Sequence, residues 1–183
     1  MATTTTATPF VMRLIGALAL DPVTYEEVEA DQSATGQALL VVVLSSIGAG
    51  IGARGFGSGS VSSMVFICAV SLLAWAAWAL LTYQIGVRIL PESRTRSDVT
   101  ELMRTIGFSS APGMLRVFGI VPGAAVPAFA ITAFWMLGTM IVAVRQALDY
   151  QSTARAIAVC VLGWGLAGAI AVGLGLVFGP PLQ

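Results

Sequence analysis

Residues 100–123 read TELMRTIGFSSAPGMLRVFGIVPG, and this stretch decides how the chain can fold. It is long and apolar enough to cross the ~30 Å hydrocarbon core of a bilayer, which takes about 20 helical residues. It also carries Arg104 near its start, Arg116 near its end and the sequence Ser-Ser-Ala-Pro-Gly at 109–113. Proline cannot donate the helical hydrogen bond, and glycine weakens the same turn. The stretch therefore predicts a membrane-spanning helix that bends at Pro112.

The composition of the whole chain supports a membrane protein. Of its 183 residues, 57% are hydrophobic and only 10% are charged, whereas a soluble domain usually has about 25% charged residues. Nine arginines balance nine acidic residues, so the net charge gives no general attraction to nucleic acid. We therefore predict an all-α, polytopic membrane helical bundle embedded in the lipid bilayer, with no nucleic-acid partner.

Four further stretches have the length and apolar character of a membrane span. They are residues 36–53, 61–85, 125–144 and 156–178. Together with residues 100–123 they predict five transmembrane helices. We expect these spans to form one membrane domain over residues 36–183, preceded by a cytoplasmic tail with one or two short helices over residues 1–35.

Two features predict the short helices of the tail. Residues 10–20 are apolar but only about half as long as a span, so they predict a helix at the membrane surface or packed on the bundle. Arg13 in this helix is expected to reach lipid headgroups. Asp21 and Pro22 are typical of the N-cap and first turn of a second helix.

The second short helix is strongly acidic. Five of the nine acidic residues lie within residues 21–31, among them Glu26 and Glu29, and Tyr25 shares a helical face with Val28. Such a helix cannot insert into hydrocarbon, so we expect it outside the membrane. It can pair with arginines, recruit a basic partner or remain solvated without a partner.

Arginine placement predicts the orientation of the spans, because cytoplasmic loops usually carry the excess of positive residues. This bias favours a cytoplasmic N-terminus and an external C-terminus. Arg104 and Arg116 are expected at the two membrane surfaces, where long side chains reach headgroups at modest cost. The predicted cytoplasmic side holds Arg13, Arg88, Arg94, Arg96, Arg104, Arg145 and Arg155, and the opposite side holds Arg54 and Arg116.

The arginines from Arg88 to Arg104 form a cluster between the second and third predicted spans. They lie on the same predicted side as the acidic helix, so Arg104 can be paired with Glu26, Glu29 or Glu101. Alternatively, the Arg88–Arg104 cluster can bind anionic lipid headgroups.

Tryptophans and small residues indicate how the spans pack. Indole N–H groups inside hydrocarbon need partners, so the four tryptophans are expected to face the bundle or a polar cavity. They serve either as packing residues bonded to a neighbouring carbonyl or as a ligand cage. The four are Trp75, Trp78, Trp135 and Trp164.

Small residues at helix-packing spacing let backbones approach closely. Gly48 and Gly52 end the first span, and Gly165, Ala169 and Gly173 form a stripe along the fifth. This stripe packs either within one bundle or between copies of the chain, as a homo-oligomer contact through the fifth span.

Residues for catalysis or metal binding form no recognisable pattern. The chain has no histidine, which is the usual general base near neutral pH and the commonest metal ligand. Cys68 and Cys160 stand alone in apolar runs, and Glu101 and Asp149 stand singly, so neither a zinc site nor an aspartyl dyad is expected. We predict no catalytic residue, no cofactor and no metal, and hence no enzyme.

A transporter or channel is the alternative that the break at Pro112 keeps open, because interrupted helices often mark substrate sites. Such proteins usually have paired breaks in repeated halves, and this sequence has no second copy of the break. A polar cavity reaching Ser109, Ser110 and Trp135 would favour transport.

Several residues follow one another in a suggestive order: Asp21-Pro22, Tyr25, Arg104, Gly107, Phe108, Ala111-Pro112, Pro122, Trp135 and Arg145-Gln146-Ala147. With five predicted spans, this order resembles the Yip family, membrane proteins named for interaction with Ypt/Rab GTPases. Eukaryotic members act in trafficking between endoplasmic reticulum and Golgi, and none has an established catalytic role. The biased composition indicates a bacterial or archaeal relative in the plasma membrane.

The resemblance and the charge pattern together imply a non-enzymatic membrane protein that organises membrane or binds a protein or lipid partner. The alternatives are a small transporter or channel, or an accessory subunit of a larger membrane complex. The protein partner is not identified by these residues. The residues expected to have structural, partner-binding or lipid-contacting roles are Asp21, Pro22, Tyr25, Glu26, Glu29, Arg104, Gly107, Phe108, Pro112, Trp135 and Arg145.

Overall fold

The computed structural model describes residues 8–56, 61–93 and 95–178, and this part of the chain is helical without a β-strand. The α-helices are α1 Phe10–Leu18, α2 Pro22–Ala30, α3 Ala34–Gly52, α4 Val61–Tyr83, α5 Val99–Ser109, α6 Ala125–Ala147 and α7 Thr153–Phe178. Three shorter segments join them: the 3-10 helices η1 Ala53–Phe56 and η3 Ala111–Ile120, and the π-helix η2 Gln84–Ile89.

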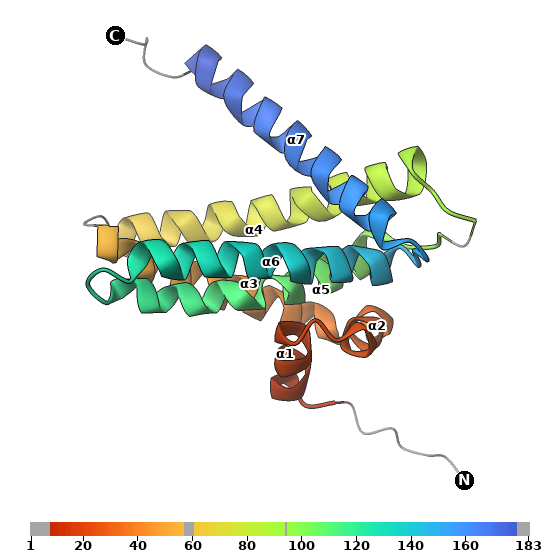
Figure 1. Ribbon diagram of the computed structural model, residues 1–183, viewed down its shortest axis with the longest axis horizontal. Helices are drawn as coiled ribbons and strands as arrows, with labels where there is room; N and C mark the ends of the chain where they lie inside the picture. The colour runs from red at the N-terminus through yellow and green to blue at the C-terminus, as the bar shows by residue number, and fades with distance from the viewer. Residues whose placement is uncertain (1–7, 57–60, 94, 179–183) are drawn as a thin grey trace.

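The long helices lie side by side along the main axis of the molecule (Figure 1). α3, α4 and α6 run nearly parallel or antiparallel to one another, and α5 continues into η3 beside them. α1 and α2 pack on one side of this bundle, whereas α7 leaves it at a wide angle. The N-terminal helices thus cover α5 and α6 rather than extend away from the bundle.

Three described helices are long and apolar enough to cross a membrane: Ala34–Gly52, Cys68–Ile89 and Ala125–Ala147. The described part of α7 adds a shorter apolar helix, Thr153–Leu166. The first, second, fourth and fifth predicted spans therefore correspond to helices, with ends within a few residues of the predicted ones, as is usual for helix boundaries.

The break predicted at Pro112 is present and is sharper than a bend. The α-helical pattern ends at Ser109, and the chain continues as the tighter 3-10 helix η3. The hydroxyls of Ser109 and Ser110 donate to backbone carbonyls one turn earlier, at 2.7 and 2.6 Å. Thr139 of α6 donates to the Ser109 carbonyl at 2.7 Å. Side-chain hydrogen bonds therefore satisfy carbonyls around the interruption.

Glycines bring α3 and η3 into backbone contact. A Cβ atom at Gly48 would lie 2.7 Å from the Met114 carbonyl oxygen, and one at Gly52 would collide with the Arg116 carbonyl oxygen. Small residues are required where helices approach so closely. The packing role expected of both glycines is confirmed, whereas Gly165 on α7 has no atom within 4 Å of its Cβ position.

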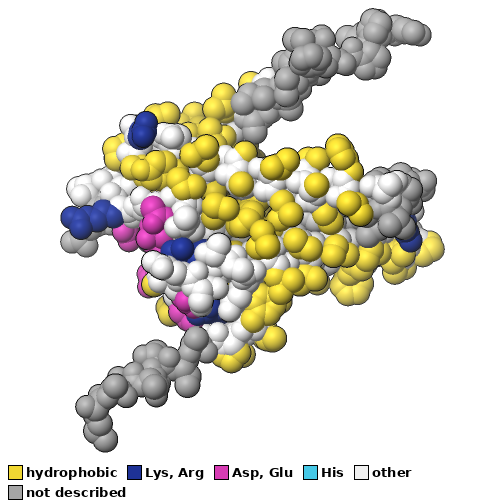
Figure 2. Space-filling model, turned by 180° about the vertical axis from the view of Figure 1, so that it is seen from behind, with side chains coloured by type: hydrophobic (Ala, Val, Ile, Leu, Met, Phe, Trp, Pro, Cys, Tyr) yellow, Lys and Arg dark blue, Asp and Glu magenta, His cyan; other side chains and the backbone are white. Residues whose placement is uncertain are grey.

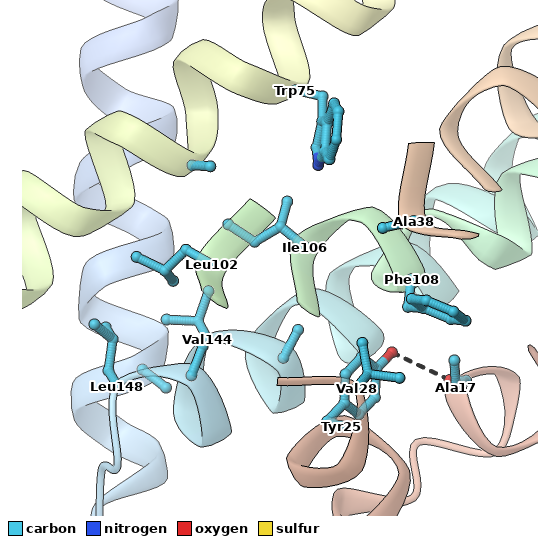
Figure 3. Packing of buried hydrophobic residues seen from close by; sticks show 14 of the residues in the cluster. Ala17, Tyr25, Val28, Ala38, Trp75, Leu102, Ile106, Phe108, Val144 and Leu148 are labelled. Atoms are coloured by element: carbon cyan, nitrogen blue, oxygen red, sulfur yellow. Dashed lines mark hydrogen bonds between the residues drawn. The ribbon is translucent and has the colours of Figure 1, made fainter. Parts of the chain in front are cut away.

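The buried core joins the N-terminal helices to the bundle (Figure 3). Tyr25 and Val28 of α2 are fully buried, as are Phe108 of α5 and Val144 of α6. The Tyr25 hydroxyl donates to the Ala17 carbonyl oxygen of α1 at 3.3 Å. α1 and α2 are therefore fixed parts of the fold. Their packing against α5 and α6 positions the candidate site.

Candidate functional site

Charged side chains gather at one end of the molecule, which we call the charged end: α2, the α4–α5 link at residues 90–98 and the α6–α7 segment at residues 148–155 (Figure 2). Hydrophobic side chains cover most of the remaining surface in this view. The acidic helix and the α4–α5 link therefore lie at the same end of the bundle, as the arrangement of the predicted spans requires.

Polar contacts connect the three segments of the charged end. Gln146 at the end of α6 donates to a Glu26 carboxylate oxygen of α2 at 2.7 Å. The backbone N–H of Gln151 donates to a Glu92 carboxylate oxygen at 2.9 Å. Arg155 lies 3.4 Å from the other oxygen of Glu92. These contacts fix both links against the ends of the helices.

Asp21, Pro22 and Tyr25 have structural roles in α2. The Asp21 carboxylate accepts hydrogen bonds from two backbone N–H groups of the first turn and from the Thr24 hydroxyl, so the predicted N-cap is confirmed. Pro22 occupies the first turn, also as predicted. Tyr25 is buried against α1, and burial raises the pKa of its phenol.

Arg13 is the centre of a buried ionic network between α1 and α2. Its Nη2 lies 2.9 Å from Glu27 Oε1 and 2.6 Å from Asp31 Oδ2, and its Nη1 donates to Gln37 at 3.1 Å. Hydrogen bonds from Ser33 and then from Arg13 lower the pKa of Asp31 to about 2. The expectation that Arg13 reaches headgroups is wrong, because its side chain is only 2% exposed. The sequence signal for this network is the i, i+4 spacing of Glu27 and Asp31, which places both carboxylates on one side of the helix.

Arg104 of α5 is buried against α2. Its Nε donates to the Glu29 carbonyl oxygen at 3.0 Å and its Nη2 donates to the same oxygen, so it caps the backbone of α2 rather than pairing with a carboxylate. The expectation that this side chain reaches headgroups is wrong, because only 4% of Arg104 is exposed and its guanidinium faces the α2 backbone. Burial, and then the charges of Glu101 and Asp149, raise the pKa of Glu29 to about 8.

Phe108 and Trp135 bind α1 to the bundle. The Phe108 ring meets the Phe10 ring edge-on, with centroids 6.3 Å apart. The Trp135 indole N–H donates to the Leu18 carbonyl oxygen at 2.9 Å, so it faces the bundle as expected. Both residues hold the N-terminal helices in place.

Gly107 and Pro112 shape α5 and the break that follows it. A Cβ at Gly107 would lie 2.7 Å from the Ala38 Cβ of α3, so only glycine permits this approach. Pro112 is buried at the start of η3. Neither side chain carries a group that reacts or binds a ligand.

The other tryptophans divide into three environments. Trp75 donates from its indole nitrogen to the Met103 carbonyl oxygen at 3.0 Å, as expected. The Trp78 indole nitrogen is buried without a hydrogen-bond partner among the described residues. Trp164 is 45% exposed, and its ring lies against the Trp78 ring, with centroids 6.5 Å apart.

A polar hollow of about 510 Å³ opens at the charged end. Arg145 lies at its edge and donates to the Tyr150 carbonyl oxygen at 3.3 Å. The Tyr150 hydroxyl lies within hydrogen-bond distance of the Gly86 carbonyl oxygen in η2, at 2.9 Å, and of the Leu90 carbonyl oxygen just after it, at 2.7 Å, a contact with no signal in the sequence. The hollow is lined by Glu26, Arg145, Gln146, Asp149, Tyr150 and Gln151.

A second cavity, of about 330 Å³, lies inside the bundle between α3, α4, α5 and α6. Ser45, Ser46 and Ser110 give it a polar wall, and Arg116 of η3 also lines it. Ser109 and Trp135 do not line it. A polar cavity reaching Ser109, Ser110 and Trp135 would favour transport, and of these three residues only Ser110 lines this cavity.

Comparison with known proteins gives no matching family model, no matching curated protein and no matching solved structure. Among the described residues, no group of three or more acidic or cysteine side chains is placed to hold a metal ion.

Proposed function

We propose that the chain is a non-enzymatic integral membrane protein that binds a partner protein at its charged end and thereby helps to organise the membrane, as the resemblance to the Yip family implies. In this proposal the charged end and the N-terminus are cytoplasmic, the C-terminus is external, and the membrane is the plasma membrane of a bacterium or archaeon. Anionic headgroups contact Arg88 and Arg96, which are exposed in the Arg88–Arg104 cluster.

The dimensions of the helices support five spans. α5 rises about 16 Å at 1.5 Å per residue, and η3 about 20 Å at 2.0 Å per residue. Laid end to end, as in Figure 1, they match the ~30 Å of hydrocarbon despite the break. The 26 residues of α7 rise about 39 Å, which is enough for a tilted span.

The observation that carries the partner-binding proposal is the polar hollow at the charged end. It combines exposed acidic groups of α2 and of the α6–α7 link with Arg145, and hydrogen bonds hold Glu26 to Gln146 and Arg145 to the Tyr150 carbonyl. Rigid placement of polar groups around a concavity is typical of binding sites. A basic segment of a partner protein complements the acidic side of the hollow.

Photo-crosslinking in living cells tests this proposal. A photoreactive amino acid is placed at Glu26 or Asp149 in the hollow and, as a matched control, at Phe134, which is 76% exposed on the apolar surface. We expect discrete protein adducts of the same mass from both hollow positions and none from position 134. Absence of such adducts, or the same adducts from all three positions, would contradict partner binding at the charged end.

A small transporter or channel is the second candidate function. The cavity that reaches Ser110 favours it, and transport of a tracer by the purified protein in vesicles would support it. At the break, however, the hydroxyls of Ser109 and Thr139 already pair with backbone carbonyl oxygens. Carbonyl oxygens that are already paired favour the partner-binding proposal over a substrate site at the break.

A further inference from the structure

Two adjacent cavities form an apolar groove along α4 and α6. The cavity of about 330 Å³ described above shares part of its wall with a second one of about 490 Å³, which lies between α4, α6 and α7. Arg116 is the only charged residue lining either cavity in the described part of the chain. The residues common to both are Trp78, Arg116, Met136 and Met140.

Arg116 has no ionic partner in the part of the chain that the structure describes. Its Nε donates to the Thr132 hydroxyl at 3.2 Å, and its guanidinium lies 5.3 Å from the centroid of the Phe129 ring. No described carboxylate forms an ion pair with it. A lone cation among apolar helices is costly, and in membrane proteins such residues usually bind an ion, a substrate or a counter-charge.

Arg116 lies near the end of the bundle opposite the charged end, because its backbone packs against Gly52. Its guanidinium contacts Thr132 and Phe129 of α6. Arg116 also borders both cavities, and the smaller one extends to Ile106 and Ser110 at the break. A cation near this end of the groove is therefore available to a ligand that lies along it.

Trp78 supplies a second unsatisfied donor beside the groove. Its ring lines both cavities, and its buried indole N–H has no partner among the described residues. A buried donor without an acceptor costs free energy.

We propose that the groove binds one anionic phospholipid, with its phosphate on Arg116 and an acyl chain along the apolar wall of α4, α6 and α7. Guanidinium and phosphate form charge-assisted, often bidentate hydrogen bonds. A phospholipid also carries ester carbonyl oxygens as acceptors for Trp78, and each cavity has the size of a ligand site. The inference requires a bilayer around the bundle but is independent of partner binding at the charged end.

Native mass spectrometry of the detergent-solubilised protein with phosphatidylglycerol tests the proposal. We expect one bound phosphatidylglycerol per chain in the unsubstituted protein, and binding weaker by about tenfold or more in Arg116→Gln. Arg54→Gln is the matched control, because Arg54 is exposed and lies in η1, near the same end of the bundle. It should bind phosphatidylglycerol as the unsubstituted protein does.

Competing ligands and a measurement on the unsubstituted protein complete the test. The assignment of a phospholipid site would be overturned if Arg116→Gln bound phosphatidylglycerol as tightly as the unsubstituted protein. It would also be overturned if inorganic phosphate or oleate displaced the bound lipid as well as unlabelled phosphatidylglycerol does. If Arg116→Gln does not fold, brominated phosphatidylglycerol should quench the fluorescence of the unsubstituted protein more than brominated phosphatidylcholine at the same mole fraction. Equal quenching by the two lipids would also overturn it.

Discussion

At the scale of single residues, the buried guanidinium of Arg13 decides whether α1 and α2 stay together. Arg13→Met leaves Glu27 and Asp31 without their cation. We expect a loss of about 2 kcal/mol in the free energy of unfolding, below the roughly 3–5 kcal/mol of a fully buried pair, because both carboxylates remain partly exposed. Detergent-induced unfolding in mixed micelles measures it. Arg96→Met, at an exposed position, is the control, and equal losses in both variants would contradict the assignment.

Glu29 makes the stability depend on pH. Its pKa is about 8 in the folded protein and 4.5 for an ordinary glutamate, so between these values the folded protein binds more protons than the unfolded one. Stability must therefore fall as the pH rises from about 5 to 8. The melting temperature of Glu29→Gln should fall less over this range. Glu26→Gln removes only the last and smallest of the causes that raise this pKa, so this variant should keep most of the decrease. A decrease equal in all three proteins would contradict the role of Glu29.

At the scale of helices, the contact of α3 with η3 depends on the absence of side chains. Gly48→Leu must push the Met114 backbone away, so we expect a destabilisation of about 1–3 kcal/mol from overpacking. Gly165→Leu is the matched control, because its Cβ position is open. Thermal unfolding in detergent should separate the two variants. If Gly165→Leu is destabilised instead, and sedimentation shows a smaller particle, the fifth predicted span is an interface between copies.

The helices themselves were largely predictable, and their contacts were not. Apolar runs gave four long helices, and Asp21 with Pro22 gave the start of α2, because these are local properties of the chain. The change to a 3-10 helix after Ser109 depends on η3 packing against Gly48 and Gly52, which no local pattern encodes. Tertiary contacts in this way override local preference.

The candidate site was predictable as a set of residues, but not as a set of roles. Arg13 and Arg104 were expected to contact lipid because long cationic side chains usually lie at membrane surfaces. Both are buried, because the acidic helix folds back onto the bundle and supplies their acceptors.

At the scale of the whole molecule, the charged end predicts which surface faces the cytoplasm. In a variant with both native cysteines replaced by alanine, single cysteines at Arg96 and at Val121 lie at opposite ends of the bundle, and both positions are exposed. We expect an impermeant thiol reagent added to intact cells to label position 121 and not position 96. Labelling of both positions only after permeabilisation, or of position 96 alone, would contradict the proposed orientation.

The folding back of the N-terminal helices sets an order of events during synthesis. The contacts of Arg13 with Glu27 and Asp31 span only 14 and 18 residues, so this hairpin can close as soon as α2 has left the ribosome. Three residues hold this hairpin to the bundle, and the ribosome adds each of them 75 to 120 residues after its partner in the hairpin. They are Arg104, Trp135 and Gln146. Until then the apolar faces of α1 and α2 have no bundle to cover them. A translating ribosome therefore exposes a closed hairpin that needs shelter, from the bilayer surface or a chaperone, until α6 is complete.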